Sequence, residues 1–288
     1  MADGRHRCAF LVAGALTDDD ALAVGPLRSL GWTVEAVPWR RPDVDWAAFD
    51  LVIIRSTWDY HLAPDEFLTT LATIDDRAGL ANPLDLVRWN SRKTYLRDLE
   101  AAGVPVVPTV FCDRLTRASL DRGFHDLGSD TLVVKPVVGA SASGTRLVRR
   151  DSTSPDEVGL DERPCLMQPL VTAVLSEGEY SVFYFDGAFS HVVRKTPAPG
   201  DFRVQEEHGG RTVVTAADAS LRRAADAVLD TLATGPLYAR VDLVRAPNAS
   251  GFWLMELELI EPVLYLAMDR EAPGRLAEGV HRWWSARG

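Results

Sequence analysis

Residues 238–262, YARVDLVRAPNASGFWLMELELIEP, decide the fold, because they predict two strands that carry charge where a buried strand usually has none. Residues 247–251 supply the turn between these strands. Side chains two residues apart in a strand point to the same face, so the charged positions of each strand gather on one side of the hairpin. Pairing of Ala246 with Phe252 would set which residues lie opposite one another.

This pairing places Asp242 opposite Glu256 and Arg240 opposite Glu258 on one face of the hairpin. The other face would carry the apolar residues Val241, Leu243, Trp253, Met255 and Leu257. Carboxylates this close repel one another unless a cation lies among them, and oxygen ligands suit a hard divalent ion such as magnesium. The pattern therefore predicts a metal site, and a solvated edge hairpin with an acidic face is the alternative.

Length and composition are those of an ordinary globular protein. The chain has 288 residues, 47% of them apolar and 25% charged, which predicts two or three lobes. The net charge of -10 argues against a nucleic-acid partner, and no apolar run is long enough to span a membrane. The N-terminal residues predict a strand and not a signal peptide. The three cysteines are scattered singly without metal-ligand spacing, which indicates a reducing compartment without a disulfide framework. We therefore expect a cytoplasmic protein, and a homo-oligomer stays open.

The first third of the chain alternates strands with helices, which is typical of a parallel α/β sheet. Strands are expected at residues 8–15, 32–37 and 50–56, and helices at 18–30 and 64–77. Ligands of such sheets bind at the carboxyl ends of the strands. The segment contains no G-x-G-x-x-G motif, so nothing in it supports a dinucleotide site.

The remaining two thirds mix helices with paired strands. Helices are expected from Asn90 or Ser91 to about Ala102, over residues 115–127 and 216–234, and from about residue 271. Strands are expected within residues 131–150, at 165–171, and at 179–196, where a hairpin turns at Asp186–Gly187. Residues 197–212 are polar and rich in glycine and proline, which predicts a mobile loop.

A loop of small residues follows the apolar strand that ends at Lys135. Its side chains would let backbone N–H groups approach an anion, and its members are Gly139, Ala140, Ser141, Ala142, Ser143 and Gly144. It lacks the Lys-Ser/Thr ending of a Walker A loop, and a flexible hairpin turn is the alternative. Lys93 lies in the first turn of its predicted helix, where the helix dipole favours acidic side chains. This position indicates that Lys93 contacts a phosphate, and an ordinary solvent-exposed lysine is the alternative.

Weaker signals lie between these motifs and the hairpin. Gln168 and the backbone of residues 169–171 could read an adenine edge, and Glu179 could accept from a ribose hydroxyl or be an ordinary loop glutamate. Four basic residues lie close together in this acidic chain: His191, Arg194, Lys195 and Arg203. Such a cluster is suited to binding phosphates, and a surface position is the alternative for each residue singly.

These parts, in this order, resemble the ATP-grasp superfamily of carboxylate–amine ligases. The resemblance runs from about Asn90 to Tyr265 and rests on Lys93, VVKP with GASASGT, MQPLV, GEYSV, YARVDLV and LMELELIEP. It implies an α/β ATP-grasp fold in which three lobes enclose ATP. These would be a Rossmann-like pre-ATP-grasp lobe at residues 1–89, a central α+β lobe at 90–172, and a C-terminal α+β lobe at 173–288.

The resemblance also implies roles for the nucleotide-binding residues. Lys93 and Lys135 would contact the ATP phosphates, and the loop of residues 139–144 would close over them. Gln168 and the backbone of Leu170 and Val171 would hold adenine, and Glu179 would hold the ribose.

For the metal and the chemistry, the resemblance implies that Asp242, Glu256 and Glu258 bind two magnesium ions, which manganese could replace. Many members have Asn where Glu258 stands, so this site is one charge more negative. Arg240 would stabilise the phosphoryl group, and Arg203 and Lys195 are further catalytic candidates.

The implied reaction joins a carboxylate to an amine of a small amino-acid-like substrate through an acyl phosphate, releasing ADP and phosphate. A small-molecule kinase of the same fold is one alternative, and a regulator that binds nucleotide without turnover is another.

Four phrases resemble the glutathione-synthetase-like branch and most resemble the O-ureidoserine cyclo-ligases of D-cycloserine biosynthesis: residues 55–60, 82–96, 187–210 and 256–266. In such an enzyme the nucleophile is part of the substrate, so the product is a ring, and the setting is natural-product biosynthesis. The expected substrate-facing residues are Arg55, Trp58, Asp59, Tyr60, His191 and Arg203. A surface turn with one packed aromatic is the alternative for residues 55–60.

Overall fold

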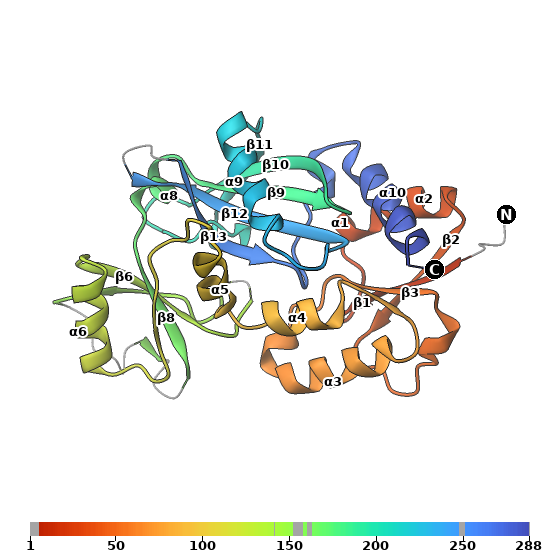
Figure 1. Ribbon diagram of the computed structural model, residues 1–288, viewed down its shortest axis with the longest axis horizontal. Coiled ribbons are helices and arrows are strands. Elements are labelled where there is room, and N and C mark those ends of the chain that lie inside the picture. Colours follow the sequence, from red (N-terminus) through yellow and green to blue (C-terminus); the bar gives the residue numbers. More distant parts are fainter. Residues whose placement is uncertain (1–5, 141, 152–157, 160–162, 248–250, 288) are drawn as a thin grey trace.

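The computed structural model describes residues 6–140, 142–151, 158–159, 163–247 and 251–287. Its strands form three sheets, and Figure 1 shows them in three groups along the molecule. The N-terminal sheet (red) lies at one end, the sheet of residues 110–169 (yellow-green) lies at the other, and the sheet of residues 179–258 (green to blue) lies between them. The mixed α/β class expected from the sequence is thereby confirmed.

The N-terminal sheet is parallel, as the alternation of strands and helices predicted. Its strands lie in the order β2-β1-β3-β4, with bounds β1 (His6–Val12), β2 (Trp32–Pro38), β3 (Leu51–Ile54) and β4 (Gly79–Ala81). Between them lie α1 (Asp18–Ala21), α2 (Val24–Ser29), η1 (Trp46–Ala48), η2 (Tyr60–Leu62) and α3 (Pro64–Asp75). The expectation of one helix over 18–30 is wrong, because Pro26 cannot donate a backbone hydrogen bond and its ring clashes with the preceding turn.

The second sheet is antiparallel and forms a separate small layer. Its order is β5-β8-β6-β7, with bounds β5 (Val110–Cys112), β6 (Thr131–Pro136), β7 (Arg146–Arg149) and β8 (Cys165–Pro169). The helix α6 (Arg117–Asp126) starts at a capping box formed by Thr116 and Ser119. It buries Leu120 and Phe124 in one apolar cluster with the strands.

The third sheet carries the hairpin and supplies most of the central core. Its order is β11-β10-β9-β12-β13, with bounds β9 (Glu179–Phe185), β10 (Ala188–Thr196), β11 (Arg211–Val214), β12 (Tyr238–Arg245) and β13 (Phe252–Glu258). The nearby helices are α5 (Tyr95–Ala101), α8 (Thr172–Ser176), η3 (Glu206–His208) and α9 (Ala219–Leu229). Leu96 and Leu99 of α5 share one apolar cluster with Leu221 and Val228 of α9 and with the sheet.

The expectation that a helix starts at Asn90 or Ser91 and runs to about Ala102 is wrong at its start, because the helix in this range begins only at Tyr95. α4 (Leu84–Asn90) ends at Asn90, and Lys93 lies in the turn before α5. The Asn90 side chain donates to the Leu257 carbonyl at 2.8 Å and accepts from the Leu259 N–H at 3.0 Å. Asn90 therefore binds the end of β13 in place of capping a helix.

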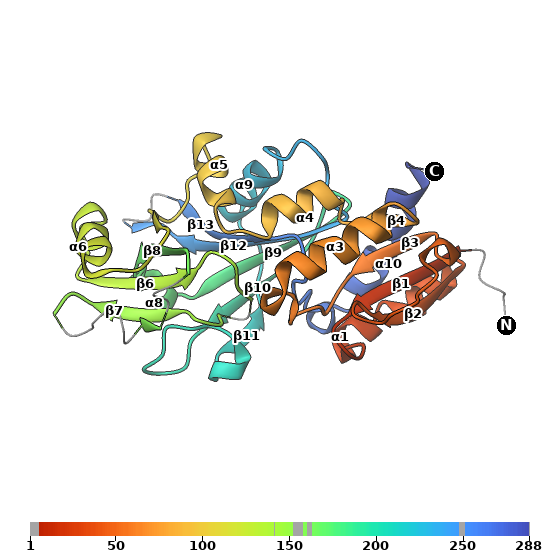
Figure 2. The same cartoon turned by 90° about the horizontal axis from the view of Figure 1, so that it is seen from below.

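The C-terminal helix returns to the N-terminal end of the molecule. After η5 (Leu266–Met268), α10 (Ala272–Ser285) lies beside α2 and β2 in Figure 1. Its residues Leu276, Val280 and Trp283 share one apolar cluster with Phe10 and Leu27. Figure 2 shows the same proximity from below, so the last segment of the chain packs against the first sheet.

The hairpin β12–β13 pairs as predicted at its charged positions. Arg240 pairs with Glu258 and Asp242 pairs with Glu256, while Phe252 pairs with Arg245 instead of Ala246. The difference comes from a β-bulge, which inserts one extra residue of β13 between the pairs of Asp242 and Leu243.

The bulge also changes which side chains share the charged face. Trp253 and Met255 pack with Val174, Val204 and Val244, apart from the cluster that holds Leu243 and Leu257. The expectation that all five apolar residues lie on the opposite face is therefore wrong for Trp253 and Met255.

Candidate functional site

A cavity of about 260 Å³ is lined by residues from all three sheet groups. Most of the site residues expected from the sequence lie on it: Trp58, Tyr60, Lys93, Lys135, Gly139, Ala140, Ala142, Ser143, Gln168, Leu170, Val171, Glu179, Lys195, Arg203, Arg240, Asp242, Glu256 and Glu258. Of the others, Arg55, Asp59, Gly144 and His191 are not among its lining residues, and Ser141 lies outside the described residues. Segments far apart in the sequence thus converge on one cavity.

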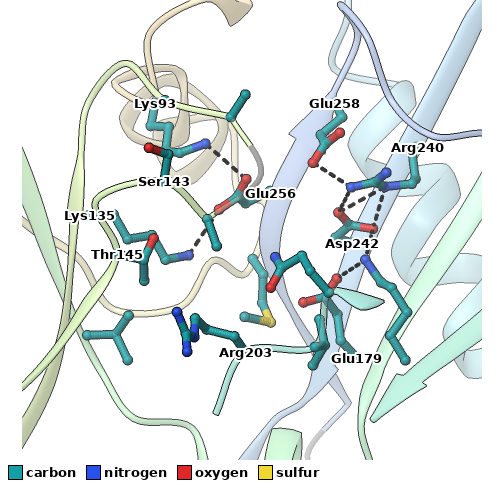
Figure 3. Close-up of a pocket in the computed structure, with 18 of the residues that line it drawn as sticks. Lys93, Lys135, Ser143, Thr145, Glu179, Arg203, Arg240, Asp242, Glu256 and Glu258 are labelled. Carbon is teal, nitrogen blue, oxygen red and sulfur yellow. Dashed lines mark hydrogen bonds and ion pairs between the residues drawn. The ribbon is translucent and has the colours of Figure 1, made fainter. Parts of the chain in front are cut away.

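One carboxylate on β13 holds both lysines. Glu256 accepts from Lys93 Nζ at 2.9 Å and from Lys135 Nζ at 3.0 Å, and Figure 3 shows both lysines reaching across the cavity toward it. Burial opposes the charge of Glu256, but the two ammonium groups outweigh it and hold the pKa of this carboxyl well below its usual range. The Lys93 N–H also donates to the Val137 carbonyl at 2.8 Å, which fixes the turn that presents its side chain.

The other two carboxylates of the hairpin are held by Arg240. Its guanidinium donates to Asp242 at 3.0–3.1 Å and to Glu258 Oε1 at 2.5 Å, and it lies between them in Figure 3. Ser181 Oγ donates to Asp242 Oδ1 at 2.5 Å. Burial raises the pKa of Glu258 above its usual value, since the charges of Asp242 and Glu256 add to the effect of burial while Arg240 opposes it.

The acidic face is therefore neutralised by the protein's own cations. Among the described residues, no three acidic, histidine or cysteine side chains come close enough to form a ready metal cluster. The carboxylates of Asp242, Glu256 and Glu258 nonetheless lie at directly paired or alternate strand positions and offer only oxygen donors. This donor set fits a hard divalent ion once the lysines and Arg240 have other anions to bind.

A buried ion pair closes the third side of this charged region. Lys195 Nζ lies 2.5 Å from Glu179 Oε1 and 3.6 Å from Asp242 Oδ1, and Lys195 and Glu179 are paired across β9 and β10. Gly178 allows this close pairing, because its φ is +107° and a Cβ there would lie 2.6 Å from the Lys195 carbonyl oxygen. Burial raises the pKa of Glu179, with the charge of Asp242 adding to it and Lys195 opposing it.

The opposite end of the cavity is apolar. Val107, Val171, Val174, Val204 and Met255 belong to one cluster and also line the cavity. Such a surface suits the flat face of a heteroaromatic ring.

Polar groups adjoin this apolar end. Gln168 Nε2 donates to Thr109 Oγ1 at 3.0 Å, and the Leu170 N–H donates to the Thr131 carbonyl at 3.2 Å. Of the two expected backbone donors, the Val171 N–H is the better candidate for a base edge, because the Leu170 N–H is engaged.

The loop of small residues forms tight turns over the cavity. Ser143 N–H donates to the Ala140 carbonyl at 2.9 Å, and Thr145 N–H donates to the Ala142 carbonyl at 3.0 Å. Ala142 and Gly144 have positive φ values of 54° and 75°. Thr145, which follows this loop, is buried and lines the cavity.

Two expected substrate residues act elsewhere. Arg55 is 2% exposed and donates to Asp20 Oδ1 at 2.8 Å and to the Pro262 carbonyl at 2.8 Å. His191 stacks on Phe183 and contacts the Leu264 carbonyl through Nε2 at 3.0 Å. The structure therefore gives both residues a positioning role.

Asp59 and Arg203 are bound by other residues of the chain. Asp59 accepts from Trp39 Nε1 at 2.7 Å and also pairs with Arg40. Arg203 lines the cavity, but its guanidinium is paired with Asp201 at 2.7 Å. Arg203 thus lies within reach of a ligand and would have to leave Asp201 to bind one.

Several lining residues were not singled out from the sequence, among them Tyr95, Thr145, Val204, Gln205, Met255, Glu261 and Tyr265. Glu261 had one usable signal, because it follows Glu256 and Glu258 in an apolar run. Glu256 and Glu258 are two residues apart, but Glu261 follows after three, because β13 ends at Glu258. The two-residue spacing of a strand therefore did not include Glu261.

The fold and the site define an ATP-grasp protein. A solved structure of a RimK-domain ATP-grasp protein from Sphaerobacter thermophilus matches with a TM-score of 0.69 and 18% identity, covering 95% of this chain and 98% of that one. The predicted fold class is thereby confirmed.

The chain belongs to the family of D-cycloserine synthetase DcsG. The cycloserine biosynthesis protein DcsG of Streptomyces lavendulae is 31% identical over 272 residues, which cover 88% of this chain and 89% of that protein. The crystal structure of D-cycloserine synthetase DcsG matches with a TM-score of 0.86 and 27% identity over 96% of this chain and 99% of that one. Residues 7–82 also match the family model for the N-terminal domain of D-cycloserine synthetase DcsG.

Family membership confirms the prediction of an ATP-dependent, ADP-forming ligase, and the use of ATP and a divalent metal ion goes with it. Among the described residues, no helix is both long enough and apolar enough to cross a bilayer.

Proposed function

We propose that this enzyme joins a carboxylate to a nitrogen nucleophile of a small amino-acid-like substrate through an acyl phosphate, with release of ADP and phosphate. One observation carries the proposal: Lys93, Lys135 and Arg240 come from separate parts of the chain and point their charges into one cavity. Each is held there by a carboxylate of the hairpin. Similarity to the cycloserine biosynthesis protein DcsG supports ring closure in natural-product biosynthesis as the form of this reaction.

In this proposal ATP lies along β13. Adenine would occupy the apolar end beside Val171 and Met255, and Glu179 would hold the ribose. The phosphates would take Lys93 and Lys135 from Glu256, with the 139–144 loop folding over them. Arg240 would bind the transferred phosphoryl group.

Asp242, Glu256 and Glu258 would hold the divalent metal, which we propose as two magnesium ions that manganese could replace. Bound metal neutralises charge on the phosphates. Lys93, Lys135 and Arg240 form ion pairs with these carboxylates in the structure. When ATP and metal bind, these cations would move to the phosphates and the carboxylates would bind the metal. The additional negative charge of Glu258 is balanced by Arg240 in the structure.

The protein would act mainly by positioning and by charge neutralisation. A substrate carboxylate oxygen bonds to the γ-phosphorus while ADP leaves, and the nitrogen lone pair then bonds to the carbonyl carbon while phosphate leaves and the nitrogen loses a proton. Arg240 and Lys195 would stabilise the charge that develops, and Arg203 would bind phosphate or the substrate carboxylate after leaving Asp201. Residues 197–212 would exclude water, which hydrolyses acyl phosphates.

The three-lobe division at residues 89–90 and 172–173 belongs to the proposal. The separate sheets support it, although α5 packs on the third sheet and α10 on the first. Cytoplasmic location is also proposed, and the three buried free cysteines are consistent with a reducing compartment.

Product analysis tests this function. We expect O-ureidoserine, offered as both enantiomers with ATP and magnesium, to yield ADP, inorganic phosphate and a cyclised product in equal amounts. A stable phosphorylated product would mean a kinase, and ATP binding without ADP formation would mean a regulator. Family membership favours neither alternative.

Site variants link the chemistry to the residues. Asp242→Asn and Glu256→Gln should abolish ADP formation while the far-ultraviolet circular dichroism spectrum stays unchanged. Full activity in both variants would refute the metal assignment.

A further inference from the structure

The segment after β13 is held by side chains at every carbonyl group from Leu259 to Leu264. The donors come from distant parts of the chain and are, in order, Asn82, Tyr238, Trp58, Arg55, Arg240 and His191. The donor–acceptor distances run from 2.7 to 3.3 Å. Because each donor fixes one carbonyl, this irregular segment has a single defined path along the cavity wall.

Glu261 is the one charged residue of this fixed segment, and its side chain lines the cavity. Among the described residues, it forms no ion pair. The other buried or half-buried carboxylates of the cavity all have a cation: Glu179 has Lys195, Asp242 and Glu258 have Arg240, and Glu256 has both lysines. Buried and half-buried carboxylates are normally paired, so Glu261, which is half-buried, is open to a cation that a ligand brings.

The position of Glu261 along the chain places it beyond the phosphoryl-transfer groups. β13 runs from Met255 at the apolar end through Glu256 to Glu258, and Glu261 follows three residues later. Three residues span at most about 11 Å, so Glu261 lies within the length of a small molecule from Glu258. A group bound there would be on the far side of the phosphates from the base.

The surroundings of Glu261 suit an organic cation. Trp58 donates from its indole Nε1 to the Glu261 carbonyl at 3.1 Å and is 39% exposed, and Tyr60 also lines the cavity. Aromatic rings in the same cavity as a carboxylate are a favourable setting for an ammonium group. Burial, with the charge of Glu258 adding to it, raises the pKa of Glu261 to about 8, because the charges of Lys93 and Arg240 offset only part of this effect.

We infer that Glu261 binds the ammonium group of the acceptor substrate and so selects amino acids over their deaminated counterparts. The inference rests on the proposed function for the identity of the site and deepens it by naming the substrate class. Glu261 would be a specificity-determining residue, with Arg55, Trp58 and His191 positioning it through the backbone carbonyls that they bind.

The test compares two compounds that differ only in this group: O-ureidoserine and its deamino analogue 3-(ureidooxy)propanoate. Affinities are measured by titration calorimetry on protein saturated with magnesium and a non-hydrolysable ATP analogue. We expect the wild-type protein to bind one enantiomer of the amino compound about 10- to 100-fold more tightly than the analogue. In Glu261→Gln that preference should fall below about 3-fold, with affinity for the analogue unchanged.

Controls separate this role from others. Glu100→Gln removes an equal charge from an exposed position of α5 and should keep the full preference. Equal loss of both compounds in Glu261→Gln would place Glu261 in metal binding or fold support, and it would overturn the inference. So would a preference that survives the substitution, or a wild-type protein that binds the two compounds equally or binds neither.

ADP formation is followed in parallel, so that the two proposals can fail separately. Ammonium-dependent binding that requires Glu261, without ADP formation, would refute the ligase proposal and leave the inference standing. ADP formation with a preference that is independent of Glu261 would overturn the inference alone.

Discussion

Replacement of Glu256 by Gln should destabilise the protein measurably, because this carboxylate bridges two ammonium groups. The side chains of Lys93, Lys135 and Glu256 are only 17%, 11% and 22% exposed. The amide oxygen of a glutamine can accept a hydrogen bond from one lysine. Its NH₂ group would face the other lysine, and two donors cannot form a hydrogen bond with each other. The loss of one charge-assisted hydrogen bond costs roughly 1.5–3 kcal/mol, and two facing ammonium groups add to it, so we expect about 2–4 kcal/mol.

The assay is urea unfolding of wild type and Glu256→Gln across a pH series, with Glu100→Gln as the exposed control. The folded pKa of Glu256 is depressed, so its stabilisation is present above the unfolded pKa of roughly 4.5 and is lost as pH falls through the folded pKa. The gap between wild type and variant should therefore be constant from about pH 8 to 5.5 and narrow below about pH 4.5. A gap of the same size at low pH, or no gap at neutral pH, would refute the reasoning.

Further expectations concern single positions of the site. Lys135→Met should weaken binding of a non-hydrolysable ATP analogue about 10-fold or more by calorimetry, since it removes a cation that we assign to the phosphates; unchanged affinity would contradict that assignment. Gly178→Ala should cost about 2 kcal/mol or more in urea unfolding, because its φ is +107° and the new Cβ would lie 2.6 Å from the Lys195 carbonyl oxygen. Asp242→Asn should weaken magnesium binding to the complex with a non-hydrolysable ATP analogue, measured by calorimetry, and an unaltered affinity for magnesium would exclude Asp242 as a ligand.

The sequence could predict the register of the hairpin at its charged positions. Alternating charge within an apolar run predicts that Arg240, Asp242, Glu256 and Glu258 share one face, and the short turn sets the pairing, which the structure has at these four positions. It could not predict the bulge, because one extra residue at Met255 has no signature in composition or spacing. The consequence is local: the bulge brings Met255 onto the face that it shares with Glu256.

The sequence also could not separate substrate residues from positioning residues. Arg55 directly follows β3 and His191 lies within β10, and a polar residue at either position fits either role. In the structure both side chains bind carbonyls of the irregular segment of residues 259–264, which has no strand partner among the described residues to satisfy those carbonyls. Such a demand arises only from tertiary packing, and the same is true of the carboxylate partner that Lys93 finds in the hairpin.

The central claim is that a substrate carboxylate is activated by phosphorylation, and isotope transfer tests it most directly. The substrate that supports ADP formation is labelled with ¹⁸O in both carboxylate oxygens, and the released phosphate is analysed by mass spectrometry. The account predicts one ¹⁸O atom in the inorganic phosphate for every product molecule, because the attacking oxygen leaves with the phosphoryl group. Unlabelled phosphate accompanying product formation would contradict the acyl phosphate and the account built on it.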